Sequence, residues 1–114
     1  MISKEEFLRI YHALGGEPEF SFFFAGTDSE YMVIKYADHA TFQRCGREDG
    51  SGEVRFTTIE ELLAADAVDG ICLERDWARI RDVVVDSHWR LDCASDREEL
   101  LLGNELASAS KPFD

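Results

Sequence analysis

The stretch FSFFFAGTDSEYMVIKY, residues 20–36, decides the fold, because a polar turn separates two apolar runs within it. The first run, residues 20–25, is far shorter than the roughly 20 residues that a membrane-crossing helix needs. Glycine and short polar side chains at residues 26–29 are typical of a turn. Residues 31–36 are rich in aromatic and β-branched types, which favour strands. The stretch therefore predicts a β-hairpin in the core of the protein.

Alternation along the two strands predicts two faces with different surroundings. The first face is expected to be apolar and buried, and comprises Phe20, Phe22, Phe24, Met32, Ile34 and Tyr36. The second face is mixed, and its apolar members are Phe23, Tyr31 and Val33, with Cys45 as a candidate from the next strand. A contiguous apolar patch of this size is usually shielded from water. The candidates for shielding it are a late helix of the chain, a second copy of the chain or a partner protein. The sequence thus predicts a candidate interface centred on Phe23, Tyr31 and Val33.

Helices are predicted on both sides of the hairpin. Residues 3–14 begin with a capping-box pattern and continue with an apolar stripe at helical spacing, and two glycines end them. A second capping box predicts a helix over residues 57–63, and a short helix is expected near residues 73–80. A last helix is expected to begin at residues 95–98, and the tail after about residue 103 is expected to fray.

Further strands are predicted at residues 39–45, 53–56 and 82–91, and Val85 is expected in the core with Phe22, Phe24 and Ile34. A run of strands with helices before and after it is typical of an α+β domain. We therefore expect an antiparallel sheet of about four to five strands, with an N-terminal helix and two or three further helices mainly on one face. At 114 residues, the chain 1–114 is expected to form a single domain.

The chain carries 24 acidic and 12 basic residues, which gives a formal net charge of −12. Such a charge repels phosphate backbones and anionic membrane surfaces, so we expect neither direct nucleic-acid binding nor membrane binding. The first ten residues carry charges where a signal peptide needs an apolar run. The three cysteines are odd in number and irregular in spacing, unlike a disulfide framework. These features favour a soluble, cytoplasmic protein.

Two groups of residues are candidates for chemistry. Asp86, His88 and Arg90 alternate along the predicted strand 82–91, which would place them on one face for acid–base catalysis. The same alternation is also typical of a solvent-facing strand, and no nucleophile is placed beside them. Cys45 lies between two arginines that could favour its thiolate, although neighbours in a strand point to opposite faces. These residues therefore remain weak catalytic candidates.

No metal or cofactor is expected. The histidines and cysteines lack the tight pairs of structural zinc sites. A calcium loop over residues 49–60 would need glycine at the position of Val54. Neither a phosphate-binding nor a dinucleotide-binding glycine motif is present in the sequence.

The sequence favours a non-enzymatic protein-binding or regulatory module, because it has no catalytic signature and its acidity suits a basic partner surface. The partner is expected to be another protein or a second copy of the chain. Two alternatives remain open. One is a nucleic-acid-mimicking inhibitor of the anti-restriction or anti-CRISPR type, which uses spaced carboxylates. The other is a small enzyme centred on Asp86 and His88 or on Cys45.

Overall fold

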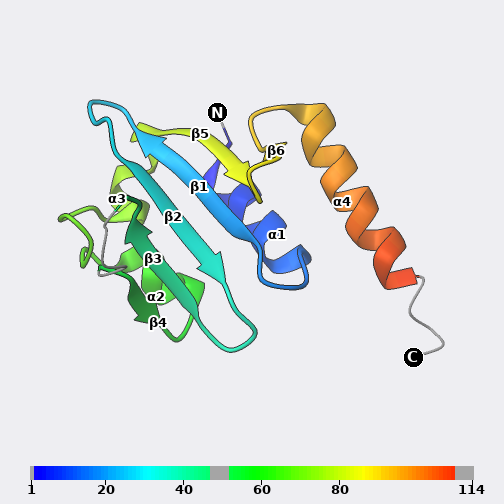
Figure 1. Cartoon of the computed structure of the whole chain (residues 1–114), viewed down its shortest axis with the longest axis horizontal. Helices are drawn as coiled ribbons and strands as arrows, with labels where there is room; N and C mark the ends of the chain where they lie inside the picture. Colours follow the sequence, from blue (N-terminus) through cyan, green and yellow to red (C-terminus); the bar gives the residue numbers. More distant parts are fainter. Residues whose placement is uncertain (1, 47–51, 110–114) are drawn as a thin grey trace.

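The computed structural model describes residues 2–46 and 52–109, with side-chain surroundings up to residue 103. The elements, in chain order, are α1 Lys4–Ala13, β1 Glu19–Phe24, β2 Glu30–Lys35, β3 Ala40–Arg44, β4 Val54–Phe56, α2 Ile59–Ala64, α3 Leu73–Asp76, η1 Trp77–Arg79, β5 Ile80–Val85, β6 Trp89–Arg90 and α4 Ala94–Ala109. They form a six-stranded antiparallel sheet with an N-terminal helix and three further α-helices, which confirms the predicted α+β class (Figure 1).

The strands lie in the order β4-β3-β2-β1-β5-β6, one more strand than the largest number expected. The additional strand arises because the predicted strand 82–91 is two strands joined by a turn. Asp86 and Ser87 both have positive φ angles, 52° and 58°, and the His88 N–H donates to the Val85 carbonyl at 3.0 Å. Two successive positive φ angles are typical of the tight turns that close hairpins. The chain therefore reverses where the sequence suggested that it continued.

Helices α1 and α2 begin as their capping patterns predict. The Ser3 side chain accepts the Glu6 N–H at 3.1 Å, and the Thr58 side chain accepts the Glu61 N–H at 3.1 Å. These bonds satisfy amide groups that have no partner within the first turn of a helix. Each helix then turns its apolar stripe toward the sheet.

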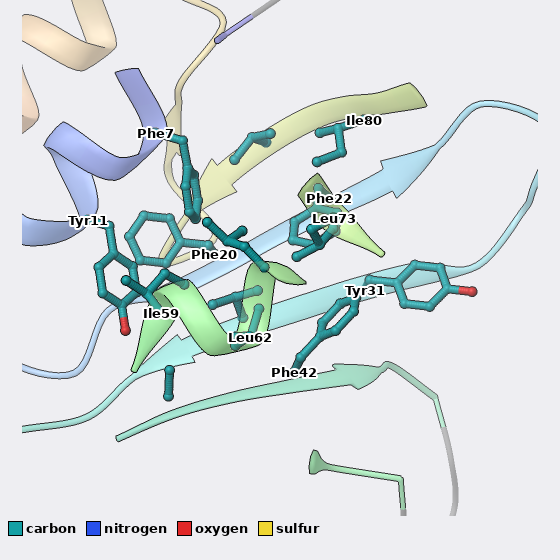
Figure 2. Close-up of a cluster of buried hydrophobic side chains, with 14 of the residues drawn as sticks. Phe7, Tyr11, Phe20, Phe22, Tyr31, Phe42, Ile59, Leu62, Leu73 and Ile80 are labelled. Carbon is teal, nitrogen blue, oxygen red and sulfur yellow. The ribbon is translucent and has the colours of Figure 1, made fainter. Parts of the chain in front are cut away.

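The core lies between one face of the sheet and the helices α1, α2 and α3 (Figure 2). Aromatic rings connect the layers: the Phe7 and Phe20 ring centroids are 5.1 Å apart, and those of Phe22 and Phe42 are 6.1 Å apart. The burial predicted for Phe22, Phe24, Ile34 and Val85 is confirmed, because each is at most 9% exposed. In Figure 1, α1 and α2 lie behind the sheet.

The assignment of side chains to the two hairpin faces is wrong for β2. Phe22 pairs with Tyr31, and Phe20 pairs with Val33, so directly opposed side chains share a face. Tyr31 and Val33 therefore join the helix-covered face, and Met32 joins Phe23 on the opposite face. The expected pairing was one residue out of register, and a slip of one residue moves every side chain of a strand to the other face.

Helix α4 is longer than expected, and its backbone remains helical through Ala109. It lies beside β6 and α1 at one edge of the sheet, where Leu100 and Leu101 pack against the core (Figure 1). The backbone of α4 is helical as far as Ala109, and fraying after about residue 103 stays a prediction. In the ranges 2–46 and 52–109, no helix combines the length and apolar character that crossing a membrane requires.

Candidate functional site

Asp86, His88 and Arg90, which the sequence placed on one face of a single strand, do not share a strand, because β5 ends at Val85 and Asp86 and His88 lie in the turn before β6. The Asp86 carboxylate accepts the Glu19 N–H at 3.0 Å, so it holds the β5–β6 turn against the start of β1. His88 is exposed, with its ring centroid 4.5 Å from that of Trp89. Arg90 lies beyond the turn on β6. The strand geometry that supported this catalytic candidate is therefore wrong.

Cys45 lies in an environment that disfavours its thiolate. Burial, and then the Glu30 carboxylate, raise the pKa of the Cys45 thiol to about 11. Arg44 points to the other side of the sheet, where its Nε lies 3.6 Å from an Asp69 carboxylate oxygen. The second flanking arginine, Arg47, lies outside the described residues. The electrostatics around Cys45 are thus opposite to those of a reactive cysteine.

Two of the three predicted interface residues belong to the interior. Tyr31 is 3% exposed and Val33 is fully buried. The Tyr31 hydroxyl donates to the Asp69 carboxylate at 2.9 Å, which fixes the ring beneath the helices. Phe23 is half-buried and lies on the face that points away from them.

We call the sheet face opposite α1, α2 and α3 the open face. The strand register assigns to it Glu19, Ser21, Phe23, Glu30, Met32, Ile34, Thr41, Gln43, Arg55, Arg81, Val84 and Arg90. Ser21 pairs with Met32 on one side and with Val84 on the other, so these side chains are neighbours. In the part of the chain that the structure describes, no helix lies over this face (Figure 1). Its centre is apolar, and its charged side chains lie around that centre.

The electrostatic surroundings of the open face are acidic at two places. Burial, followed by the carboxylates of Glu53, Glu17 and Glu19, raises the pKa of Tyr36, which directly follows β2. Glu30 and Glu19 likewise contribute to raising the pKa of the Cys45 thiol, which lies near the end of β3. Carboxylates raise a pKa by disfavouring a second negative charge nearby. The same groups would attract a positive charge placed on this face.

A cleft of about 460 Å³ lies between β5, β6 and the start of α4. Its lining includes Asp82, Arg90, Asp92 and Cys93. Hydrogen bonds from the Ser95 hydroxyl and from the backbone at the start of α4 lower the pKa of the Cys93 thiol. Cys93, rather than Cys45, is therefore the cysteine whose surroundings favour a thiolate. The capping pattern at residues 95–98 was the sequence signal for a helix start nearby, but α4 begins at Ala94, so Ser95 lies within its first turn rather than at its cap.

A groove of about 280 Å³ lies between the end of α1, the β2–β3 turn and the start of α2. It contains two histidine–carboxylate pairs, of which one joins neighbours in the β2–β3 turn and the other joins α1 to α2, a contact that the sequence did not indicate. His12 Nε2 lies 3.6 Å from a Glu60 oxygen, and His39 Nδ1 lies 2.6 Å from an Asp38 oxygen. Over the described chain, no three histidine, cysteine or acidic side chains are arranged to hold a metal ion.

Lys35 also lines this groove, but its ammonium group is directed into the fold. Its Nζ donates to the carbonyl oxygens of Tyr11 and Leu14, both at 2.7 Å, at the C-terminal end of α1. Burial lowers the pKa of Lys35. A cation at this end of a helix satisfies unpaired carbonyls and opposes the helix dipole. Lys35 therefore has a structural role that joins α1 to β2.

Three surfaces are thus candidates for a functional site: the open face, the cleft beside Cys93 and the groove between His12 and His39. No protein-family model, no curated protein and no solved structure matches the chain. The open face extends across all six strands, whereas the cleft and the groove are each local to a few neighbouring segments.

Proposed function

We propose that this protein is a non-enzymatic protein-binding module and that the open face is its binding surface. One observation carries the proposal: the helices α1, α2 and α3 all pack on the opposite face of the sheet. The open face nevertheless has half-buried apolar side chains at its centre, namely Phe23, Met32 and Val84, while Ile34 of the same face is buried.

A sheet with one solvated face normally alternates apolar residues toward the core with polar residues toward water. The centre of the open face departs from that pattern, since Phe23 and Met32 are half-buried without a helix above them. Burying apolar surface is worth about 25 cal/mol per Å², so a protein that covers these side chains gains free energy. An apolar centre within a polar, charged margin is also the usual anatomy of a protein–protein interface.

The apolar centre favours a protein-binding module over a mimic of nucleic acid, because mimicry relies on carboxylates spaced like phosphates. The raised pKa of Cys45, and the turn that replaces a continuous strand between Asp86 and Arg90, favour the binding module over the enzyme alternative. We further propose a cytoplasmic location. Its support is that Cys45, Cys72 and Cys93 are all free thiols, as expected in a reducing compartment.

The test is affinity capture from native lysate with a matched pair of variants. Met32→Glu places a charge at the centre of the open face, and Leu102→Glu places one on α4, where Leu102 is 56% exposed. We expect the wild type and Leu102→Glu to retain the same protein and Met32→Glu to lose it. Circular dichroism must show that both variants remain folded. Sedimentation of the wild type shows whether the retained protein is a second copy.

Retention that is equal in all three proteins would contradict the proposal. A wild type that is monomeric and retains nothing would contradict it as well.

A further inference from the structure

The strand register arranges the open face in rows that run across the sheet, with β1 between β2 and β5 (Figure 1). In one row, Phe23 of β1 pairs with Glu30 of β2 on one side and with Arg81 of β5 on the other. Directly paired residues lie side by side on the same face. A carboxylate and a guanidinium therefore flank one aromatic ring, and the two charges lie on opposite sides of β1.

The neighbouring row lies two residues away along the strands. Its middle residue is Ser21 of β1, which pairs with Met32 of β2 and with Val84 of β5. Farther out, Gln43 pairs with Met32, and Arg90 pairs with Val84. This row thus has an apolar side chain on each side of β1, and its positive charge lies on the same side as that of the first row.

This arrangement makes the open face complementary in charge to its own copy. Two identical surfaces that meet across a two-fold axis repeat every contact between different residues twice. With the axis along β1, side chains of β2 lie over side chains of β5 of the other copy. Glu30 then meets Arg81 of the second copy, and Arg81 meets Glu30 of the second copy.

The apolar side chains of the two rows follow the same symmetry. Met32 meets Val84 of the second copy, and this contact also occurs twice. Phe23 lies on the axis and meets Phe23 of the second copy, and aromatic pairs of this kind add to the free energy gained by burial. All three side chains are half-buried in the single chain, so each has surface left to cover.

The mixed charges of the face favour a second copy over a partner of a single charge sign. A cationic surface over Phe23 meets Arg81 on one side, and an anionic surface meets Glu30 on the other. A second copy carries both signs in the order that this row requires. Each copy has a formal net charge of −12, but salt at about 0.15 M largely screens repulsion beyond about 8 Å, so the charges in direct contact decide.

We propose, on the basis of the proposed use of the open face, that its occupant is a second copy of this chain, packed face to face across a two-fold axis along β1. Sheets that pack in this way lie about 10 Å apart, with their strands within about 30° of each other. From strand spacing and rise, the six strands give a face of about 24 by 17 Å, which is at the small end of stable interfaces. The dimer is therefore reversible, with a dissociation constant on the order of micromolar.

The same axis assigns an opposite role to a second carboxylate. Glu19 lies on β1 two residues before Ser21 and on the same face, so it is also close to the axis. It therefore approaches Glu19 of the second copy, and like charges that meet across an interface oppose association. Removing the charge of Glu30 should thus weaken the dimer, whereas removing the charge of Glu19 should strengthen it.

Sedimentation equilibrium at about 0.15 M salt measures these effects. We expect Glu30→Gln to raise the dissociation constant of the dimer about fivefold, because two ion pairs are lost. Glu19→Gln should lower it about threefold. The matched control is Glu98→Gln on α4, where the side chain is exposed, and it should change the constant by less than about 1.5-fold. Circular dichroism must show that each variant remains folded.

Mixing two charge-reversal variants tests the contact directly. Glu30→Lys alone opposes two cations across the axis, and Arg81→Glu alone opposes two carboxylates, so each should be largely monomeric. An equal mixture restores opposite charges at both contacts and should associate at least about tenfold more tightly than either variant alone. The control mixture of Glu98→Lys with Arg9→Glu changes the charges equally and should gain nothing over its components. The Gln variants of Glu19 and Glu30 keep the test valid even where Arg81→Glu does not fold, since they leave the Arg81 bonds to backbone carbonyls intact.

A wild type that is monomeric at about 300 μM overturns the inference, because a micromolar dimer would be populated there. Weakening by Glu19→Gln as well as by Glu30→Gln overturns it too, and so does a mixture of the reversal variants that does not associate. These outcomes are distinct from failure of the proposed function. If the wild type is monomeric and Met32→Glu still loses a different captured protein, the second copy is wrong and the open face remains the binding surface. A dimer that is unchanged by Glu30→Gln and by Met32→Glu uses another surface, and both proposals then fail.

Discussion

Phe22 and Phe23 are adjacent in the sequence but have different surroundings in the structure. Phe22 is 2% exposed, and its ring packs against those of Phe24 and Phe42 at centroid distances of 5.7 and 6.1 Å. Phe23 is half-buried on the open face. Because the cost of truncating a side chain depends on the cavity left behind, this pair separates core packing from surface contact.

We expect Phe22→Ala to lower the free energy of unfolding by about 3–5 kcal/mol, because the surrounding rings cannot close the cavity. Phe23→Ala should cost less than half as much, since solvent already reaches that ring. Urea unfolding followed by circular dichroism measures both. Equal costs for the two variants would show that the two faces have been assigned wrongly.

The thiols should differ in reactivity. Hydrogen bonds at the start of α4 lower the pKa of Cys93, whereas burial and Glu30 raise the pKa of Cys45 to about 11. Because the thiolate is the reactive form, iodoacetamide at pH 8 should label Cys93 faster than Cys45 in the folded protein. Mass spectrometry of peptides after timed quenching gives the two rates.

The control for this labelling is the denatured, unreduced protein, in which Cys45, Cys72 and Cys93 should all be labelled because all three are free. Faster labelling of Cys45 than of Cys93 in the folded protein would contradict the prediction.

Tyr11 should make the fold sensitive to alkali. Burial, and secondarily Glu60, raise its pKa from 10.0 to about 12. Below pH 10 the Tyr11 hydroxyl is protonated in both the folded and the unfolded state, so Tyr11 makes its full contribution to the free energy of unfolding. As the pH rises from 10 toward 12, the unfolded state loses its proton first, and the stabilisation is lost.

We therefore expect the stability of the wild type to fall more steeply above pH 10 than that of Tyr11→Phe, which retains the ring and lacks the ionisable hydroxyl. Unfolding free energies measured at several pH values from 8 to about 11.5 test this difference. Parallel curves for the two proteins would mean that Tyr11 does not contribute.

At the scale of single elements, the β5–β6 hairpin is the element whose structure departs most from expectation. Its turn requires positive φ angles at two residues that are not glycine, Asp86 and Ser87. Asp86 compensates through its hydrogen bond from the Glu19 N–H, whereas Ser87 is exposed to solvent. Side chains in this conformation are strained relative to glycine.

Ser87→Gly should therefore stabilise the protein by about 0.5–1 kcal/mol, because glycine adopts the left-handed conformation without strain. Ser87→Ala is the matched control and should give no gain, since alanine keeps the Cβ atom. Thermal unfolding of the three proteins provides the comparison. An equal gain for alanine would assign the effect to loss of the hydroxyl instead.

At the scale of the whole molecule, charge opposes the compact state. The net charge of −12 belongs to a chain whose cations are largely occupied within it: Arg75 bonds Asp76, Arg9 bonds Glu6, and Lys35 bonds backbone carbonyls. Carboxylates without such partners repel one another, and salt at about 0.1 M largely screens this repulsion beyond about 10 Å.

The unfolding temperature should accordingly rise when sodium chloride is increased from about 0.02 M to about 0.3 M. Glu98→Lys with Glu99→Lys changes the net charge from −12 to −8, because each substitution adds two positive charges, and should show a smaller rise. Scanning calorimetry at both salt concentrations gives the unfolding temperatures of the wild type and of the double variant. A fall in the unfolding temperature with salt would show that attractive ion pairs dominate instead.

The sequence by itself determined the elements whose causes are local. Capping side chains and apolar stripes lie within one or two turns of each other, so α1 and α2 could be placed from the chain alone, and the two apolar runs of residues 20–36 identified a hairpin. It could also indicate that Phe22, Phe24 and Val85 are buried, because their strands are apolar and flanked by turns.

The tertiary structure alone decided which residues share a face and which surfaces form. Met32 lies on the open face and Tyr31 in the core because hydrogen bonds between β1 and β2 set the register. In that register Phe23 pairs with Glu30, and the residues between them, 24–29, are even in number, so Phe22 faces Tyr31 rather than Met32. The cleft beside Cys93 and the groove between His12 and His39 likewise join segments far apart in the sequence. Local patterns carry no information about such contacts, because their geometry arises when the sheet pairs and the helices pack upon it.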